Sequence, residues 1–247
     1  MMSKIEDEFK KAEMYQLLKY PKLSGCIRDG VLYPEAYKES PLKMMIILKE
    51  PFDEWDEITQ SPVGGDFCFE DVTNNLEAEY SKGLNRTWLK VAAMAYAIKN
   101  NTEYTEDLSL EQVREGLSCI CWINLSKTPW KNQSDIKDIN YLARVADWEP
   151  VVKCQLESTD FNLIFYGYTW DCSMLNPIEP KNRWDYTKVK DKQDYNYSSA
   201  TGKKYGIQIF HYQGSNKIIV NGYHPEFGNS ACWQTGFIQN YINKYGL

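Results

Sequence analysis

The chain has 247 residues, a formal net charge of −6 and 43% hydrophobic residues. This length suits one large α/β domain, and the hydrophobic content excludes general disorder. The negative charge argues against binding nucleic acid by bulk electrostatics, although it leaves room for a local basic groove.

Membrane and metal functions have no support in the sequence. No apolar run is long enough to cross a membrane, and the charged beginning, Met1–Asp7, does not resemble a signal peptide. The seven cysteines form no Cys-x-x-Cys pair and no Cys/His cluster, so a zinc or iron–sulfur site is not expected. We therefore expect a cytoplasmic monomer that has no metal, no other cofactor and no membrane partner.

The predicted elements alternate between helix and strand. An amphipathic segment at residues 4–20 predicts a helix that ends near Pro21. Four apolar runs of strand length follow at residues 43–48, 119–124, 161–166 and 217–220, and a hairpin at residues 206–212 leads into the last of them. Helical patterns cover residues 84–98, 108–117, 134–156 and 230–245. This order predicts a three-layer α/β/α sandwich around a central four-stranded parallel sheet.

We expect a single domain over residues 1–247. Residues 1–42 form its N-terminal helical extension, and the polar, aromatic residues 170–205 form an insertion at the edge of the sheet. Residues 52–81 show no regular pattern. Basic and aromatic residues are mixed at residues 179–204, which suits either a nucleic-acid strand or a solvated loop.

Residues whose side chains can bind a ligand or take part in a reaction stand at the ends of the predicted strands. Glu50 comes after the first, Asn124 ends the second, Tyr168 follows the third, and His224 follows the fourth. Because the carboxyl ends of parallel strands meet at one edge of a sheet, this order predicts a pocket that contains a carboxylate, an amide and an imidazole.

The same residues resemble the motifs of the uracil-DNA glycosylase superfamily over about residues 43–247. Glu50-Pro51-Phe52 is similar to its first motif, Trp122-Ile123-Asn124 to its apolar strand that ends in Asn, and His224-Pro225 to its final His-Pro. The resemblance implies a DNA glycosylase, in which Glu50 orients a water and stabilises the cationic sugar. His224 would donate a hydrogen bond to the leaving base, and Asn124 would read the edge of the base.

The glycosylase interpretation assigns further residues to the base and to DNA. A flipped base needs an aromatic wall, for which Phe69 and Phe52 are the candidates. Phe227 would fill the vacated stack. Lys127 and Lys131 would contact phosphates, as would the backbone at Ser230, where the last helix begins.

Uracil is the default substrate under this resemblance, in base-excision repair. A hypermodified base of viral DNA is an alternative and would make the protein a defence enzyme. Two further alternatives are a non-catalytic binding module for DNA or protein on the same fold, and an unrelated α/β enzyme acting on a nucleotide-like molecule. The absence of a Walker-type or Gly-x-Gly-x-x-Gly phosphate loop weakens the last one.

Overall fold

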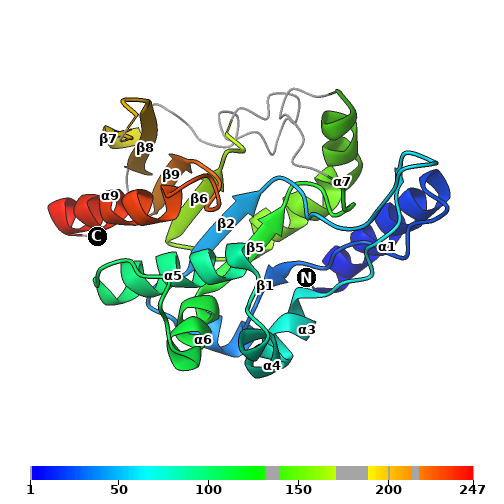
Figure 1. Ribbon diagram of the computed structural model, residues 1–247, viewed down its shortest axis with the longest axis horizontal. Helices are drawn as coiled ribbons and strands as arrows, with labels where there is room; N and C mark the ends of the chain where they lie inside the picture. Colours follow the sequence, from blue (N-terminus) through cyan, green and yellow to red (C-terminus); the bar gives the residue numbers. More distant parts are fainter. Residues whose placement is uncertain (1, 132–138, 171–188, 200, 213–216, 247) are drawn as a thin grey trace.

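The computed structural model describes residues 2–131, 139–170, 189–199, 201–212 and 217–246 (Figure 1). Its centre is a mixed sheet in the order β1-β5-β2-β6-β9-β8-β7. The strands are β1 (Gly30–Val31), β2 (Met44–Leu48), β5 (Ile120–Asn124), β6 (Leu163–Gly167), β7 (Val189–Ser198), β8 (Lys204–Tyr212) and β9 (Ile218–Gly222).

The four predicted core strands are confirmed as neighbours in this sheet. The strands β5, β2, β6 and β9 are parallel, and every residue of β2, β5 and β6 is buried. Burial on both faces explains why these strands are continuous apolar runs in the sequence instead of alternating apolar and polar residues.

The sheet is wider than the four strands that the sequence predicted. Among the described residues it has seven strands. The short strand β1 adds an antiparallel neighbour to β5, and β8 and β7 extend the other edge in antiparallel pairs beyond β9. Part of the predicted N-terminal extension and part of the predicted edge insertion therefore belong to the sheet, whereas residues 171–188 lie outside the described residues.

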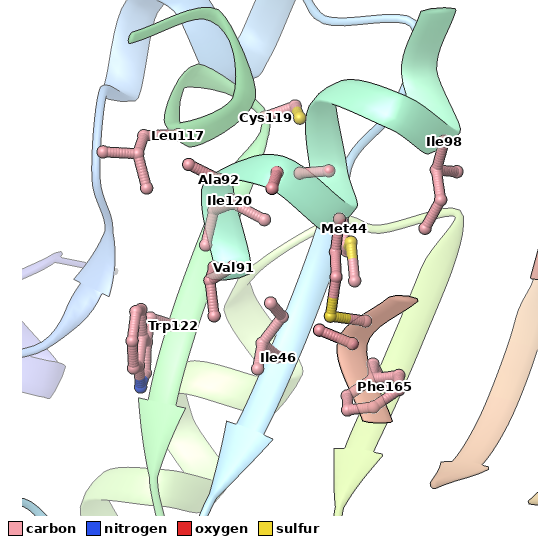
Figure 2. Packing of buried hydrophobic residues seen from close by; sticks show 14 of the residues in the cluster. Met44, Ile46, Val91, Ala92, Ile98, Leu117, Cys119, Ile120, Trp122 and Phe165 are labelled. Atoms are coloured by element: carbon pink, nitrogen blue, oxygen red, sulfur yellow. The ribbon is translucent and has the colours of Figure 1, made fainter. Parts of the chain in front are cut away.

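Helices cover both faces of the sheet, as the α/β sandwich prediction requires. One face is covered by α5 (Arg86–Asn100), α6 (Leu110–Ser118) and α9 (Ser230–Tyr245), and the other by α7 (Ile139–Ser158). Figure 2 shows Val91 and Ala92 of α5 over Ile46 and Trp122 of the sheet. The first helix, α1 (Met2–Lys19), packs on the outer side of α7 through Phe9 and Trp148, whose ring centroids are 5.2 Å apart.

Two of these helices are in very close contact. A Cβ atom on Gly116 of α6 would lie 2.2 Å from the carbonyl oxygen of Ala92 in α5, so only glycine fits there. The helix α6 begins at a capping box in which Ser109 and Gln112 each bond the other's backbone N–H. Gly116 thus permits the close contact between α5 and α6, and the capping box fixes where α6 begins.

The irregular stretch at residues 52–81 contains short elements that the sequence did not indicate. These are the two-stranded sheet of β3 (Trp55–Asp56) and β4 (Ser61–Pro62), and the helices α3 (Phe69–Asn74) and α4 (Leu76–Ser81); α2 (Pro34–Glu39) lies nearer the N-terminus. None of the helices in the described residues has the length and apolar character needed to span a membrane.

Candidate functional site

A pocket of about 960 Å³ opens at the carboxyl edge of the parallel strands. The end of β5 and residues after β2 and β9 form one side, and α3, α4 and the beginning of α5 form the other. Five of the residues predicted from the sequence line it: Glu50, Phe52, Phe69, Asn124 and His224. The fold therefore brings the carboxylate, the amide and the imidazole to one cavity.

The wall of the pocket next to the sheet is aromatic. The rings of Phe69, Trp88 and Trp122 have centroids 4.9 to 5.2 Å apart. The indole N–H of Trp122 is buried and has no hydrogen-bond partner in the described structure. Figure 2 shows this nitrogen on the side of the ring that faces the carboxyl end of β5. A buried donor without a partner costs about 1–3 kcal/mol, and an acceptor on a ligand in the pocket would remove that cost.

Asn124 is held from behind by Asp29, whose side chain is fully buried. The Oδ2 atom of Asp29 accepts hydrogen bonds from the backbone N–H of Asn124 at 2.7 Å and from its Nδ2 at 3.1 Å. Because a carboxylate can only accept, Nδ2 is the amide atom that faces Asp29. The opposite end of the amide, Oδ1, is thereby directed away from Asp29.

Lys127 does not have the role that the sequence suggested. Its side chain is fully buried, and its ammonium donates to Asp29 Oδ1 at 2.6 Å and to the carbonyl oxygen of Asn124 at 2.7 Å. Burial lowers the pKa of Lys127, and the charge of Asp29 opposes this shift. A lysine enclosed in this way cannot reach a phosphate at the surface. It supports Asn124 from inside the protein.

Glu50 lies at the pocket with its carboxylate in a buried ion pair. Arg144 of α7 donates to Glu50 Oε2 at 2.6 Å, and the two side chains are 1% and 2% exposed. The guanidinium of Arg144 also lies 3.6 Å from the ring centroid of Trp130. The ion pair fixes the position of the carboxylate, and it connects the pocket to the helix on the far face of the sheet.

The loop that carries His224 is fixed by three buried polar side chains. Gln234 accepts from the backbone N–H of Tyr223 and donates to its carbonyl oxygen, at 2.6 and 3.2 Å. Ser230 donates to the carbonyl oxygen of His224 at 2.7 Å, and Lys90 donates to that of Gly228 at 3.0 Å. Such satisfied buried groups hold a loop in one conformation.

The protonation state of His224 follows from its contacts. Its Nδ1 accepts the backbone N–H of Glu226 at 3.2 Å, so the proton of a neutral ring is on Nε2. Burial, together with the charges of Lys49 and Lys90, lowers the pKa of His224 to about 4. At neutral pH the residue is therefore an uncharged imidazole with one N–H to donate.

The remaining predicted residues are dispersed. Phe52 is 75% exposed at the mouth of the pocket, and Phe227 is 45% exposed. Lys131 is ion-paired with Glu57 at 3.6 Å, beside the β3–β4 sheet. The predicted phosphate contact at Ser230 is not supported by its surroundings, because the hydroxyl braces the His224 loop and the backbone N–H donates to the carbonyl oxygen of Phe227.

Charge is uneven around the mouth of the pocket. Four acidic side chains line it, against a single lysine, Lys82. Asp71 and Glu79 belong to α3 and α4, Asp53 to the loop after β2, and Glu226 to the loop after His224. These carboxylates would repel a phosphate backbone. In the described residues no three His, Cys, Asp or Glu side chains are grouped as metal ligands would be.

The sequence did not reveal the supporting residues. Trp122 could have been found, since it lies two residues before Asn124 and so on the same face of the strand. Asp29, Arg144 and Lys90 approach the site from distant segments, and no local pattern indicates them.

Comparison of the sequence with protein-family models and with curated proteins gives no match.

Proposed function

We propose that the protein is a DNA glycosylase on a uracil-DNA glycosylase-like fold, which hydrolyses the N-glycosidic bond of a flipped uracil or modified pyrimidine. The observation that supports this most directly is that Glu50, Asn124 and His224 line one pocket with an aromatic wall. These groups match the needs of the reaction, which develops positive charge on the sugar and negative charge on the departing base.

His224 acts on the leaving base in this proposal. When the bond between the sugar and the base breaks, its electron pair moves onto the base, and negative charge grows on a carbonyl oxygen of the base. The neutral imidazole donates the Nε2–H to that oxygen. A low pKa suits this task, because the ring keeps a neutral donor at pH 7. The buried contacts of Ser230 and Lys90 hold the loop, so little reorganisation is needed during the reaction.

Glu50 and Asn124 act on the other two partners of the reaction. The carboxylate of Glu50, held by Arg144, stabilises the cationic sugar and orients the water that attacks it. Water supplies the oxygen and one hydrogen of the new hydroxyl on the sugar, its other proton passes to the base, and the base leaves as a neutral free molecule. Asn124, fixed by Asp29, hydrogen-bonds the edge of the flipped base.

The size of the pocket favours a substrate larger than uracil as a second candidate. A volume of about 960 Å³ is near the upper end of the roughly 300–1,000 Å³ that is usual for pockets binding whole drug-sized ligands. A pyrimidine that carries a bulky substituent would fill more of it. Hypermodified bases occur in viral DNA, so excision of such a base would serve antiviral defence.

Base release tests the proposal directly. The protein is incubated with uracil-containing DNA and with DNA from viruses that modify their bases, and freed bases are identified by mass spectrometry. We expect release by the wild type and a rate lower by about 100- to 1,000-fold for His224→Ala. His211→Ala is the matched control, because His211 is the other histidine of the chain and contacts Tyr241 on the β8–α9 side.

The outcome separates the glycosylase from a binding module. Loss of release in Glu50→Gln and His224→Ala, with the His211→Ala rate unchanged, supports hydrolysis in this pocket. No release from any DNA by a folded wild-type protein would favour the alternative that the fold serves as a non-catalytic binding module.

A further inference from the structure

We infer that a strip of aromatic rings beside the pocket binds an unpaired nucleic-acid strand and leads it to the pocket. We define the aromatic strip as Tyr168, Tyr205, Tyr223 and Phe227, with Lys203 and Lys204 at its outer end. The part of the inference that leads the strand to the pocket rests on the proposed function. Binding of the strand to the strip can be measured without any base release.

The register of the sheet places the outer end of the strip beside the pocket. Gln208 of β8 pairs with Asn221 near the end of β9. Tyr205 precedes Gln208 by three residues in β8. Because β8 is antiparallel to β9, Tyr205 lies about 10 Å from that pair in the direction in which β9 ends. The β7–β8 hairpin thus projects past the carboxyl edge of the parallel strands, on the side of the sheet where β9 ends (Figure 1). His224, which lines the pocket, is two residues after the end of β9.

The rings are connected from the hairpin to the strand ends. Tyr205 contacts Phe227 and Tyr223 edge to face, with centroids 5.4 and 5.7 Å apart. Tyr223 and Phe227 are stacked at 5.2 Å, and Tyr168 lies nearly parallel to Tyr223 at 6.3 Å. Tyr223 directly precedes His224, and the backbone N–H of Phe227 donates to the carbonyl oxygen of His224 at 2.9 Å. The strip therefore lies beside the loop that carries the pocket imidazole.

Solvent reaches these rings. Tyr168 is 48% exposed and Phe227 is 45% exposed, whereas Tyr205 and Tyr223 are half-buried. Behind them, Tyr197 is stacked on Trp233 of α9 with ring centroids 5.2 Å apart. Tyr223 lies between Phe227 and Tyr168, which are both nearly parallel to it. The ring surface most open to a ligand therefore belongs to Tyr168 and Phe227, at the two ends of this stack.

Positive charge lies at the outer end of the strip. The ammonium of Lys203 is 5.4 Å from the ring centroid of Tyr205, and both Lys203 and Lys204 are exposed near the turn of the hairpin. Lys190 and Lys192 of β7 lie at a register shift in a strand at the edge of the sheet, where lysines prevent pairing with other strands. Three of the four acidic side chains at the pocket mouth, Asp53, Asp71 and Glu79, belong to segments outside the strip, and the fourth, Glu226, is next to Phe227. A phosphate backbone is therefore repelled less on the hairpin side.

This chemistry fits a single strand better than a duplex. The exposed faces of the rings can stack on bases only if those bases are unpaired, and stacking of this kind does not depend on sequence. Two lysines give little of the electrostatic attraction on which duplex binding depends, in a protein whose net charge is −6.

Fluorescence anisotropy with a labelled oligonucleotide tests the inference. The oligonucleotide is a single strand of about 15 nucleotides without modified bases or uracil, compared with its duplex. We expect tighter binding of the single strand. Tyr168→Leu and Tyr205→Leu remove a ring but keep an apolar side chain, and each should weaken single-strand binding by about fivefold to a hundredfold. The double variant Lys203→Ala/Lys204→Ala should reduce the salt slope of log K by about 1.4.

Matched controls come from α1. Tyr15→Leu removes a tyrosine that is 52% exposed, and Lys10→Ala/Lys11→Ala removes two exposed lysines; none of these changes should alter binding. The inference is overturned if the duplex binds as tightly as the single strand, or if the strip variants bind like the controls. A protein that binds single strands through the strip but releases no base keeps this inference and loses the proposed function. A protein that releases a base at the same rate in the strip variants, and that does not bind single strands, keeps the proposed function and loses this inference.

Discussion

The carboxylate of Asp29 accepts two hydrogen bonds from Asn124, one from its backbone N–H and one from its side-chain amide. Asp29 belongs to the segment before β1, 95 residues away in the sequence. The same carboxylate binds the ammonium of Lys127 at 2.6 Å, where both side chains are fully buried. The pocket amide is thus oriented by a charge pair that no solvent reaches.

Removing one member of that pair should destabilise the protein more than removing both. Lys127→Met leaves the buried Asp29 without its cation, which we expect to lower the free energy of unfolding by about 3–5 kcal/mol. The double variant Asp29→Asn/Lys127→Met removes both charges and should lower it by less. Urea unfolding of the wild type, both single variants and the double variant measures this coupling. Additive losses would show that the two charges do not depend on one another.

The free energy of unfolding should decrease as the pH is lowered, and His224 should account for part of this decrease. Its pKa in the folded protein is lowered to about 4, whereas in an unfolded chain it is about 6.5. Between these values the unfolded chain binds the proton more readily, so stability is present above about pH 6.5 and is lost as the pH falls toward about 4. From about pH 7 to about pH 4.5 we expect this residue to account for about 2–3 kcal/mol.

His224→Gln isolates that contribution. Its loss of stability over the same pH range, measured by urea unfolding, should be smaller than that of the wild type because glutamine does not titrate. Equal losses would mean that the fold does not disfavour the charged imidazole.

Two glycine-to-alanine changes should have opposite effects. Gly116→Ala would bring a methyl group against the Ala92 carbonyl oxygen between α5 and α6, and overpacking of this kind costs about 1–3 kcal/mol. Gly236→Ala in α9 meets no atom within 4 Å. It should raise stability by up to about 1 kcal/mol, because alanine favours helix. Thermal unfolding compares the two, and destabilisation by both would contradict the local packing described for α9.

The ion pair between Glu50 and Arg144 should matter far more than an exposed pair. Arg144→Met removes the buried partner of Glu50, and we expect a loss of about 3–5 kcal/mol in the free energy of unfolding. The control is Lys11→Met on α1, which removes an exposed partner of Glu8 and should cost less than about 1 kcal/mol. Urea unfolding measures both losses. Similar losses of the free energy of unfolding in the two variants would contradict the burial of the Glu50–Arg144 ion pair.

The core of the fold could be predicted from the sequence because burial on both faces leaves a clear signal. The segment from Met44 to Leu48 is apolar at every position, and a run that is this short and is closed by Glu50-Pro51 favours a central strand. Edge strands lack this signal. Strand β7 carries charged residues on its exposed positions, and only the tyrosines at 195 and 197 indicate that one face is covered.

The sequence could predict the residues of the candidate site that line the pocket, but not the residues that support them. Glu50, Asn124 and His224 could be inferred because each follows an apolar run, and parallel strands bring such positions together. Lys127 follows Asn124 closely in the sequence, and proximity alone suggested a phosphate ligand. Its burial depends on Asp29, 98 residues away, and contacts over that distance are not visible in local patterns.

The order of the strands also has a consequence for synthesis of the protein. The sheet grows outward from β2, with β5 on one side and then β6 and β9 on the other. A nascent chain can therefore pair β2 with β5 while the C-terminal third is still being made. His224 comes from the loop after the last strand, and its supports Ser230 and Gln234 belong to the helix that follows. The pocket is complete only after β9 and the following residues have emerged from the ribosome, so chains that end before β9 would carry part of the scaffold without its chemistry.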